Sequence, residues 1–536
     1  MNTRRTVEPS QSRTFIDGLL AEQQELPAVE KFSRKHAQYA APLLEKYYRD
    51  LIPLTTPRPG EQYAFEVNLD TCSGCKACVT ACHNLNGLDE GETWREVGVL
   101  MGGTRAQPAQ LPLTTACQHC VEPGCRSSRP VEASDKEATT GIVRHHDDQC
   151  IGCQYCTWTC PYEVPKYSAK RGIVRKCDMC HGRLADGEAP ACVQACPNGA
   201  IRITVVEKHS ARDRAASGIF LEDAPDPRIT VPSTRYQTNR TFTEKLRAGD
   251  HGELRLQPTH WPLVFMLVLT QMSAGLYLLN TFSQWNGAFS GSGLSANERL
   301  GLAALAAGLL ASVIHLGRPQ HAWRAFLGWR HSWLSREVIA FGAFFSLAAV
   351  HSMIGTFYSS LATAAAGALA VVCSAMVYHA TRRQFWHGRH VAIRFFGTAA
   401  VLGLAWNVCA SAFRQEDTAL LFSMGLMAVS AAKLAWEWVS MTSSSKTQSS
   451  ELLRSATLMR GQLRHVTGAR FLCGLCGGVV LPLGFLAEPI NPMIPLLALG
   501  FCVAGEIQER VLFFTAVAPA KMPGEFKVHS RTRRNL

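Results

Sequence analysis

The N-terminal region lacks the apolar segment that an export signal needs. Arg4 and Arg5 resemble the start of a twin-arginine signal, but the stretch FIDGLLAEQQELPAVEKF that follows is amphipathic and acidic. We therefore expect the soluble part of the chain to stay in the cytoplasm. Thiols remain reduced there, which disfavours a disulfide framework for the 20 cysteines.

Charged residues are scarce in the second half of the 536-residue chain. Residues 1 to about 258 are rich in charge, proline and cysteine, whereas the rest is a series of apolar runs. Each run is near the roughly 20 residues that cross a bilayer. Eight spans are predicted, at about 261–281, 299–316, 337–357, 361–380, 394–412, 418–439, 469–487 and 493–514.

Fifteen cysteines fall in four groups in the first half of the chain. The groups are Cys72, Cys75, Cys78 and Cys82; Cys117, Cys120 and Cys125; Cys150, Cys153, Cys156 and Cys160; and Cys177, Cys180, Cys192 and Cys196. The spacing C-x2-C-x2-C-x3-C folds a short loop around an iron–sulfur cube, and the cysteine before a proline ligates a neighbouring cluster. One position of the pattern lacks its cysteine: Arg129 stands there, before Pro130.

Zinc is the main alternative, because paired C-x-x-C units also form tetrahedral structural sites. Zinc leaves the third cysteine of each C-x2-C-x2-C group and the trailing Cys-Pro pairs unexplained. The predicted fold is therefore an α+β ferredoxin-like multi-cluster iron–sulfur domain followed by an all-α eight-helix transmembrane bundle. The five remaining cysteines lie in the predicted spans and are expected to be packing residues.

The predicted domain boundaries follow these changes in composition. We expect a helical N-terminal arm over 1–60, the cluster domain over 61–204, a polar linker over 205–258, the membrane anchor over 259–516 and a basic cytoplasmic tail over 517–536. The linker could equally wrap the cluster domain, contact a partner or act as a plain tether.

Basic residues gather in alternate loops between the predicted spans. On one side lie Arg318, Arg324, Arg330, Arg336, Arg382, Arg383, Arg389, Arg394, Lys446, Arg454, Arg460, Arg464 and Arg470, with the tail residues Lys521, Lys527, Arg531, Arg533 and Arg534. The positive-inside rule places the cluster domain and both termini in the cytoplasm. This topology also explains the net charge of +12, so no nucleic-acid partner is expected.

Several segments resemble two subunits of the dimethyl sulfoxide reductase family. The cysteine groups, YEVPKYSAKRGIVRKCDMC and ACVQACPNGAI resemble its iron–sulfur subunit, and HLGRP and SWLSREV resemble its membrane-anchor subunit. The resemblance implies that both subunits are fused in one chain. It also implies an electron-transfer unit that docks to a separate molybdopterin-containing catalytic subunit and exchanges electrons with the membrane quinone pool.

The resemblance assigns the cysteines to clusters. Cys72, Cys75, Cys78 and Cys196 would hold the first cluster; Cys82, Cys177, Cys180 and Cys192 the second; Cys117, Cys120, Cys125 and Cys160 the third; and Cys150, Cys153 and Cys156 the fourth. The family has a fourth ligand where Arg129 stands, and a guanidinium cannot ligate iron. Three 4Fe-4S clusters are therefore expected, with three outcomes for the fourth: a 3Fe-4S cluster, a 4Fe-4S cluster with a foreign ligand such as Ser127, Ser128 or water, or no cluster.

Polar residues near the cytoplasmic ends of the second and third spans are the predicted quinone site. His315 is the candidate for proton transfer, and Arg318 and Arg336 would orient the quinone head. Lys433 and Glu437, one helical turn apart, are interpreted as a structural pair. The alternatives are the same relay serving a hydrogenase or formate dehydrogenase, a cluster-energised transporter, and a zinc-bound scaffold.

Overall fold

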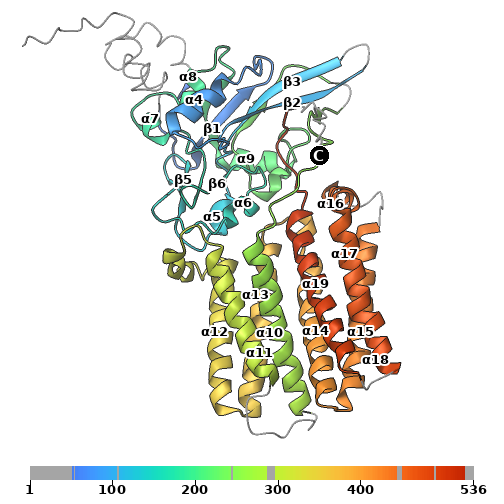
Figure 1. The fold of residues 1–536 in the computed structure, drawn as a ribbon. Helices are drawn as coiled ribbons and strands as arrows, with labels where there is room; N and C mark the ends of the chain where they lie inside the picture. The colour runs from blue at the N-terminus through green and yellow to red at the C-terminus, as the bar shows by residue number, and fades with distance from the viewer. Residues whose placement is uncertain are drawn as a thin grey trace, which may run out of the picture.

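The computed structural model describes residues 51–53, 55–104, 108–242, 245–285, 296–442, 450–487 and 491–525. Figure 1 shows a mixed α/β domain standing on one end of a bundle of long helices. The two parts correspond to the predicted cluster domain and membrane anchor. Most of the predicted helical N-terminal arm (1–60) lies outside the described residues, and so does the end of the tail beyond 525.

Four small sheets form the framework of the upper domain. β1 (Glu61–Asn68) pairs with β8 (Ile201–Glu207) antiparallel and with β9 (Arg235–Gln237) parallel. The second sheet joins β2 (Glu96–Gly103), β3 (Pro108–Thr115) and β10 (Arg247–Ala248), and two hairpins join β4 (Ser134–Lys136) to β5 (Val143–His145) and β6 (Lys166–Ser168) to β7 (Ile173–Arg175). Such small sheets bury little apolar surface, so the packing depends strongly on the loops between them.

Short helices follow the cysteine loops. They are α4 (Ala77–Asn86), α5 (Gly124–Ser127), α6 (Tyr155–Thr159), α7 (His181–Ala185) and α8 (Ala191–Gln194), with α9 (Lys208–Ala216) after β8. Gly74 and Gly152 lie between the first two cysteines of their groups and have φ angles of 73° and 71°. Glycine adopts this left-handed conformation at no steric cost, which allows the tight turn of each loop.

The segment predicted as a linker, 205–258, folds against the cluster domain. It completes β8, forms α9 and adds β9 and β10 to two different sheets. The Val121 N–H donates to the Val231 carbonyl (2.7 Å), and the Ser233 hydroxyl donates to the Gln118 carbonyl (2.9 Å). Of the possibilities that the sequence left open, the structure therefore favours a segment that wraps the domain over a plain tether.

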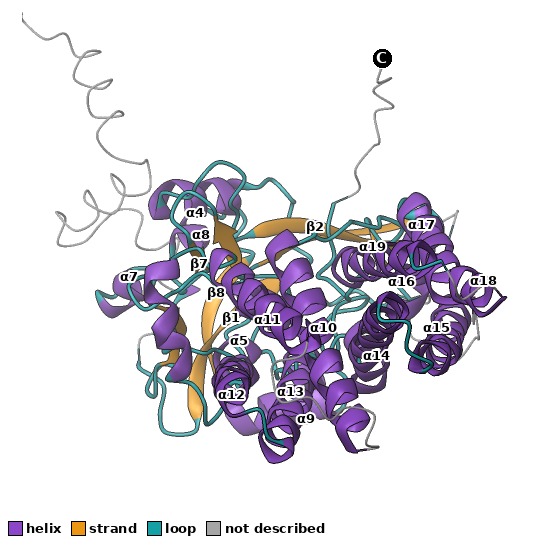
Figure 2. Ribbon diagram, turned by 60° about the horizontal axis from the view of Figure 1, so that its bottom comes forward, coloured by secondary structure: helices purple, strands orange, loops and turns teal. Residues whose placement is uncertain are grey.

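The lower part consists of long apolar helices. They are α10 (Trp261–Trp285), α11 (Ala296–Ile314), α12 (Trp333–Ile354), α13 (Phe357–His379), α14 (Gly388–Phe413), α15 (Thr418–Thr442), the continuous run of α17 (Arg464–Leu475), η5 (Cys476–Val480) and α18 (Leu481–Ala487), and α19 (Met493–Thr515). The short α16 (Ser450–Arg460) lies at the end nearer the cluster domain (Figure 1). Figure 2 views the molecule from another angle and shows these helices packed side by side.

Seven of these helices, within the described part of the chain, are long and apolar enough to span a membrane. The predicted count of eight is therefore approximate. The eighth predicted span corresponds to α19, which is not among these seven helices. It lies within the bundle but carries Glu506, Glu509 and Arg510 in its second half, and all three are buried among the other helices. The chain is a multi-pass membrane protein.

Three glycines form a close backbone contact between the two parts. The loop after α11 lies against the third cysteine group, where the Gly317 N–H donates to the Gly152 carbonyl and the Arg318 N–H to the Ile151 carbonyl (3.1 Å). A Cβ atom on Gly317 would lie 2.1 Å from the Gly172 oxygen, and one on Gly152 would lie 2.3 Å from that same oxygen. Only residues without a side chain allow these backbones to approach so closely.

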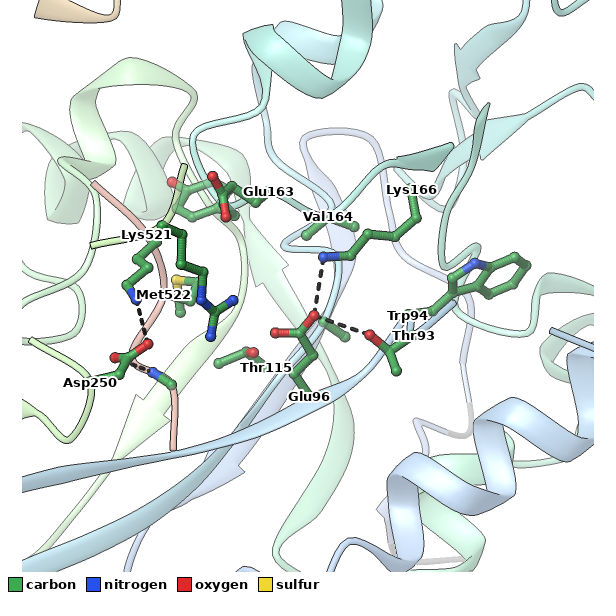
Figure 3. A pocket seen from close by; sticks show the side chains of 14 residues that line it. Thr93, Trp94, Glu96, Thr115, Glu163, Val164, Lys166, Asp250, Lys521 and Met522 are labelled. Carbon is green, nitrogen blue, oxygen red and sulfur yellow. Dashed lines mark hydrogen bonds and ion pairs between the residues drawn. The ribbon is translucent and has the colours of Figure 1, made fainter. Parts of the chain in front are cut away.

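The C-terminal segment after α19 forms a second connection. Lys521 forms an ion pair with Asp250, the Val99 N–H donates to the Gly524 carbonyl (3.3 Å), and Glu525 pairs with Lys76 (2.8 Å). Figure 3 shows the small hollow beside this segment, where Lys521 and Asp250 face each other and Lys166 pairs with Glu96. The described part of the predicted tail therefore packs against the cluster domain.

We predict that Gly317→Ala disrupts the contact between the two parts. The added methyl group requires a shift of the backbone of Gly172, so we expect a loss of about 1–3 kcal/mol of stability. The change should lower the melting temperature by several degrees and increase proteolytic cleavage between the parts. Gly342→Ala in α12 is the control, because its Cβ would meet nothing within 4 Å; equal melting temperatures for both variants would contradict the prediction.

Candidate functional site

The first two cysteine sets lie beside each other in the upper domain. Burial raises the pKa of Cys72, and the neighbouring thiols of Cys78, Cys196 and Cys75 raise it further. Burial also raises the pKa of Cys82 to about 12, with Cys192 contributing; the pKa of Cys180 is raised by burial, Cys192 and Cys82. The chain thus brings Cys196 to the first group and Cys82 to the last, as the cross-ligation pattern requires.

The second and third groups also approach each other. Burial raises the pKa of Cys120 well above its usual value, and Cys117, Cys160 and Cys125 add to the effect. Buried thiols that raise one another's pKa are poor thiolates on their own, and bound iron stabilises them as thiolates. The donor sets therefore fit iron–sulfur clusters. No three Cys, His, Asp or Glu side chains in the described ranges converge to hold a single metal ion.

Three cysteines of the third group lie close to the membrane bundle. Burial raises the pKa of Cys156, with further contributions from Cys153 and Cys150 and then from Cys125 and Cys160. The latter two belong to the neighbouring set. Cys150 packs with Ala325 of the segment between α11 and α12. These three cysteines therefore contact the anchor.

Arg129 lies beside these groups, against the anchor. The Ser332 hydroxyl, which precedes α12, donates to the Ser128 carbonyl (2.8 Å), and a Cβ on Gly328 would lie 2.6 Å from the Pro130 oxygen. Burial and the neighbouring Arg126 lower the pKa of Arg129, yet a guanidinium remains protonated in proteins. Its Nε and Nη1 atoms are buried without a hydrogen-bond partner among the described residues.

Backbone amides point at several of the thiols. The Met179 N–H donates to Cys177 Sγ (3.4 Å), and the Ala200 N–H donates to Cys196 Sγ (3.2 Å). Lys76, Gln154 and Met179 have φ angles of 63°, 59° and 63°, and each lies next to a cysteine. Successive amides in such turns form concave nests that stabilise anions, including iron–sulfur clusters.

Two buried cations lie between successive sets. Arg95 interacts with Cys192, Cys177 and Cys82 of the second set and with Cys78 of the first. Lys176 interacts with Cys177 of the second set and with Cys117 and Cys125 of the third; its ammonium lies 4.0 Å from Cys117 Sγ. Burial opposes the charge of Lys176, but these thiols raise its pKa overall. Lys176 lies in the segment YEVPKYSAKRGIVRKCDMC, directly before Cys177, but its role beside the thiols was not predicted, and no cysteine group contains Arg95.

The loop of Cys150, Cys153 and Cys156 inserts two aromatic side chains into the bundle. Tyr155, 1% exposed, donates its hydroxyl proton to the Val377 carbonyl of α13 (2.6 Å). Trp158 lies edge-on to Trp386, with ring centroids 5.6 Å apart, and near Tyr378 at 5.8 Å. The innermost set is thus joined to the anchor by packed rings.

His315 follows α11 and lies at this junction. Its ring is 5.3 Å from that of His260, which in turn is 5.3 Å from Trp158. Burial lowers the pKa of His315 to about 4, with a contribution from His260, and burial lowers the pKa of His260 to about 4. Burial therefore favours the neutral form of both imidazoles. The buried Nε2 of His315 has no hydrogen-bond partner among the described residues.

Arg318 and Arg336 have other neighbours. Arg318 donates to the Asp147 carbonyl (2.7 Å), and Arg336 donates to the carbonyls of Trp329 (3.1 Å) and Arg330 (2.8 Å). Both arginines therefore donate hydrogen bonds to the backbone of loops. Glu337, adjacent to Arg336, is instead 5% exposed and interacts with Tyr155, so it faces the cysteine loop. The sequence places Glu337 at the start of the third span but contains no sign that it turns toward this loop.

Charged residues of three helices form one buried network in the other half of the bundle. Glu437 accepts two hydrogen bonds from Arg470 (both 3.0 Å), and Glu506 pairs with Lys433 and with Arg470 (3.2 Å). Lys433 and Glu437 lie 3.9 Å apart. Their predicted pairing is present, although each has a closer partner on another helix. The network links α15, α17 and α19 and is consistent with a structural role.

Comparisons with known proteins agree with this arrangement. Residues 110–206 match the model of a 4Fe-4S dicluster domain, and residues 257–515 match that of the DMSO reductase anchor subunit (DmsC). The B subunit of the anaerobic dimethyl sulfoxide reductase of Haemophilus influenzae is 32% identical over 189 residues, which are 34% of this chain and 91% of that protein.

Two further relatives carry other names. Hydrogenase-2 operon protein HybA of Escherichia coli O157:H7 is 38% identical over 220 residues, 36% of this chain and 62% of HybA. The Formate dehydrogenase-O iron-sulfur subunit of Escherichia coli K12 is 32% identical over 174 residues, 29% of this chain and 58% of that protein.

The fold, the thiol sets and the matches to family models together define an iron–sulfur electron-transfer protein with its own membrane anchor. More narrowly, the chain belongs to the dimethyl sulfoxide reductase family of iron–sulfur subunits, with the anchor subunit fused behind the cluster domain.

We predict that Lys176→Met lowers the midpoint potentials of the two sets that flank this residue. A buried cation stabilises the added electron, so its loss should lower each potential by roughly 100–200 mV, the size expected of one charge a few ångström away at an effective dielectric constant of about 20. A redox titration followed by EPR measures the shift. Lys170→Met, at an exposed position, is the control, and equal potentials in both variants would refute the assignment.

Proposed function

We propose that the chain carries electrons between membrane quinol and a separate catalytic subunit. The observation that carries the proposal is the linear order of the four thiol sets. Arg95 lies near cysteines of the first and second sets, and Lys176 lies near cysteines of the second and third sets. Cys156 of the fourth set lies near the third set and packs against the anchor. Iron–sulfur clusters supply one-electron transfer at each set, and the protein fixes their positions and potentials.

The proposed ligands are the 15 cysteines of the four groups, in the sets that the family pattern gives. Their mutual proximity supports the first three sets as 4Fe-4S sites. The fourth set has Cys150, Cys153 and Cys156, with Arg129 in place of a ligand. We propose a 3Fe-4S cluster there, whose potential the positive charge of Arg129 raises.

The proposed quinone site lies where the Cys150 loop meets the ends of α11, α12 and α13. Its support is the cluster of His315, His260 and Trp158 together with the buried Glu337 beside Tyr155. Neutral His315 accepts a proton from quinol, and Glu337 provides a second polar group. Arg318 and Arg336 act by bracing the loops around the site.

The electrons leave the chain at the end of the relay farthest from the bundle. A catalytic subunit of the kind implied by the matched relatives docks there, and we propose that it holds molybdopterin. The positive-inside distribution supports a cytoplasmic cluster domain and cytoplasmic termini, with the anchor in the inner membrane. If the catalytic subunit oxidises its substrate, electrons flow in the opposite direction, from that subunit through the clusters to quinone.

A second candidate function rests on the matches to HybA and to the formate dehydrogenase iron–sulfur subunit. The same relay would then serve a hydrogenase or a formate dehydrogenase. Metal analysis of the purified complex separates the possibilities, because a hydrogenase partner brings nickel, whereas molybdenum or tungsten marks the other partners.

We predict that His315→Ala abolishes quinol-dependent turnover, with at least a 100-fold loss of rate, because general-base catalysis contributes about that much. Iron content and the visible spectrum should not change. The control is His465→Ala, an exposed histidine near the start of α17. Turnover of His315→Ala at the wild-type rate would remove this residue from the site.

The cluster type at the fourth set is tested by Arg129→Cys. The oxidised wild-type protein should give the EPR signal of a 3Fe-4S cluster near g = 2. Its intensity should correspond to about one spin per chain, because one such cluster is proposed. The variant restores the missing thiolate, so this signal should disappear and iron content should rise by one atom per chain. Four ordinary 4Fe-4S signals in the wild type would contradict the proposal.

A further inference from the structure

A cavity of about 670 Å³ separates the cluster domain from the bundle on the side of Arg129. The cluster domain contributes the segment 121–129 to its wall. The bundle contributes His331, which lies two residues before α12, and residues 380–382, which follow α13. The cavity therefore lies at the ends of two helices long enough to span a membrane.

The lining of the cavity is strongly cationic. Arg126, Arg129 and Arg382 line it, and Arg382 also donates to the Ile229 carbonyl (3.0 Å). The one carboxylate among the described lining residues, Glu122, forms an ion pair with Arg212 outside the cavity (3.1 Å). The wall thus has a positive charge that its own acidic group does not balance, which favours an anionic occupant.

The neighbouring segment locates the membrane surface. η3 (Pro319–Phe326) and the residues after it expose Trp323 (59%) and Trp329 (54%). Arg324 and Arg330 lie over these rings, 5.7 and 5.4 Å from the ring centroids. Tryptophan and arginine side chains of this kind lie at the level of lipid head groups. Because His331 follows directly, the cavity opens at head-group depth.

The helices that lead away from the cavity have apolar outer faces. Ile339 of α12 is 40% exposed and Val372 of α13 is 41% exposed, each about two turns from the helix end nearest the cavity. An anion bound in the cavity would thus continue onto a surface that suits acyl chains. A cationic cavity next to apolar helix faces suits a lipid, whereas a small soluble anion would need only the cavity.

We propose that the cavity binds the phosphate head group of an anionic phospholipid, with Arg126 and Arg382 as its main ligands. Guanidinium groups match phosphate oxygens with paired, charge-assisted hydrogen bonds. Basic pockets on the cytoplasmic side of spanning helices bind anionic head groups by the same chemistry. The lipid would fill the seam between the cluster domain and the anchor.

The experiment uses the full chain with its co-purifying subunits in detergent. Native mass spectrometry counts retained lipid after addition of phosphatidylglycerol or of phosphatidylcholine in equal amounts. We expect the wild type to retain one phosphatidylglycerol and no phosphatidylcholine at that level. Each arginine contributes about fivefold to such binding, so Arg126→Gln with Arg382→Gln should weaken it about 30-fold.

A matched pair of variants controls for the loss of two charges. Arg202→Gln with Arg240→Gln removes two partly exposed arginines that pair with Glu66 and Asp70 away from the cavity, and this variant should bind lipid normally. Arg126→Lys with Arg382→Lys keeps the charge and should retain most binding. Unchanged iron content and melting temperature show that each variant is folded.

Two results would overturn the proposal. One is equal retention of phosphatidylglycerol by the cavity variant and by the control variant, which would place the lipid elsewhere. The other is complete displacement of phosphatidylglycerol by millimolar inorganic phosphate, which would assign the site to free anions. Lipid that stays bound in phosphate and is lost in the cavity variant supports it.

Discussion

The close approach of Gly152 and Gly172 to Gly317 determines how the third cysteine loop lies against the bundle. Three residues without side chains let the third cysteine loop lie directly on the loop after α11. The same approach brings Tyr155 and Trp158 into the bundle and places His315 beside His260. Without it, the cluster nearest the membrane and the proposed quinone site would not share an interface. The C-terminal segment, held through Asp250, fixes the other side of the domain.

Buried charge is used differently in the two parts of the molecule. In the cluster domain, Arg95 and Lys176 are cations that lie among thiols, and they favour the extra electron of a reduced cluster. In the bundle, the carboxylates of Glu437 and Glu506 are paired with cations on neighbouring helices. A buried pair of this kind holds helices in register, and removing one partner leaves an uncompensated charge.

Local spacing predicted most of the functional architecture. Cysteines three residues apart and apolar runs of spanning length each determine structure over a few turns of chain. Contacts between distant segments were not predictable in this way. The pairing of β9 and β10 with earlier strands, the turn of Glu337 toward Tyr155 and the meeting of Lys433 with Glu506 depend on tertiary packing. Arg129 was only partly predictable. The cysteine motif identifies its position, whereas its surroundings depend on packing against the anchor.

A quinone-linked relay requires that quinone oxidise the reduced clusters of this chain directly. The chain, reconstituted in vesicles without a catalytic subunit, is reduced with dithionite and freed of excess reductant. A quinone analogue is then added while the visible absorption of the clusters is followed. The account predicts that the absorption of the oxidised clusters returns within seconds, and that this return is lost in His315→Ala. Reoxidation that is no faster with quinone than without it would contradict a quinone-linked relay in this chain.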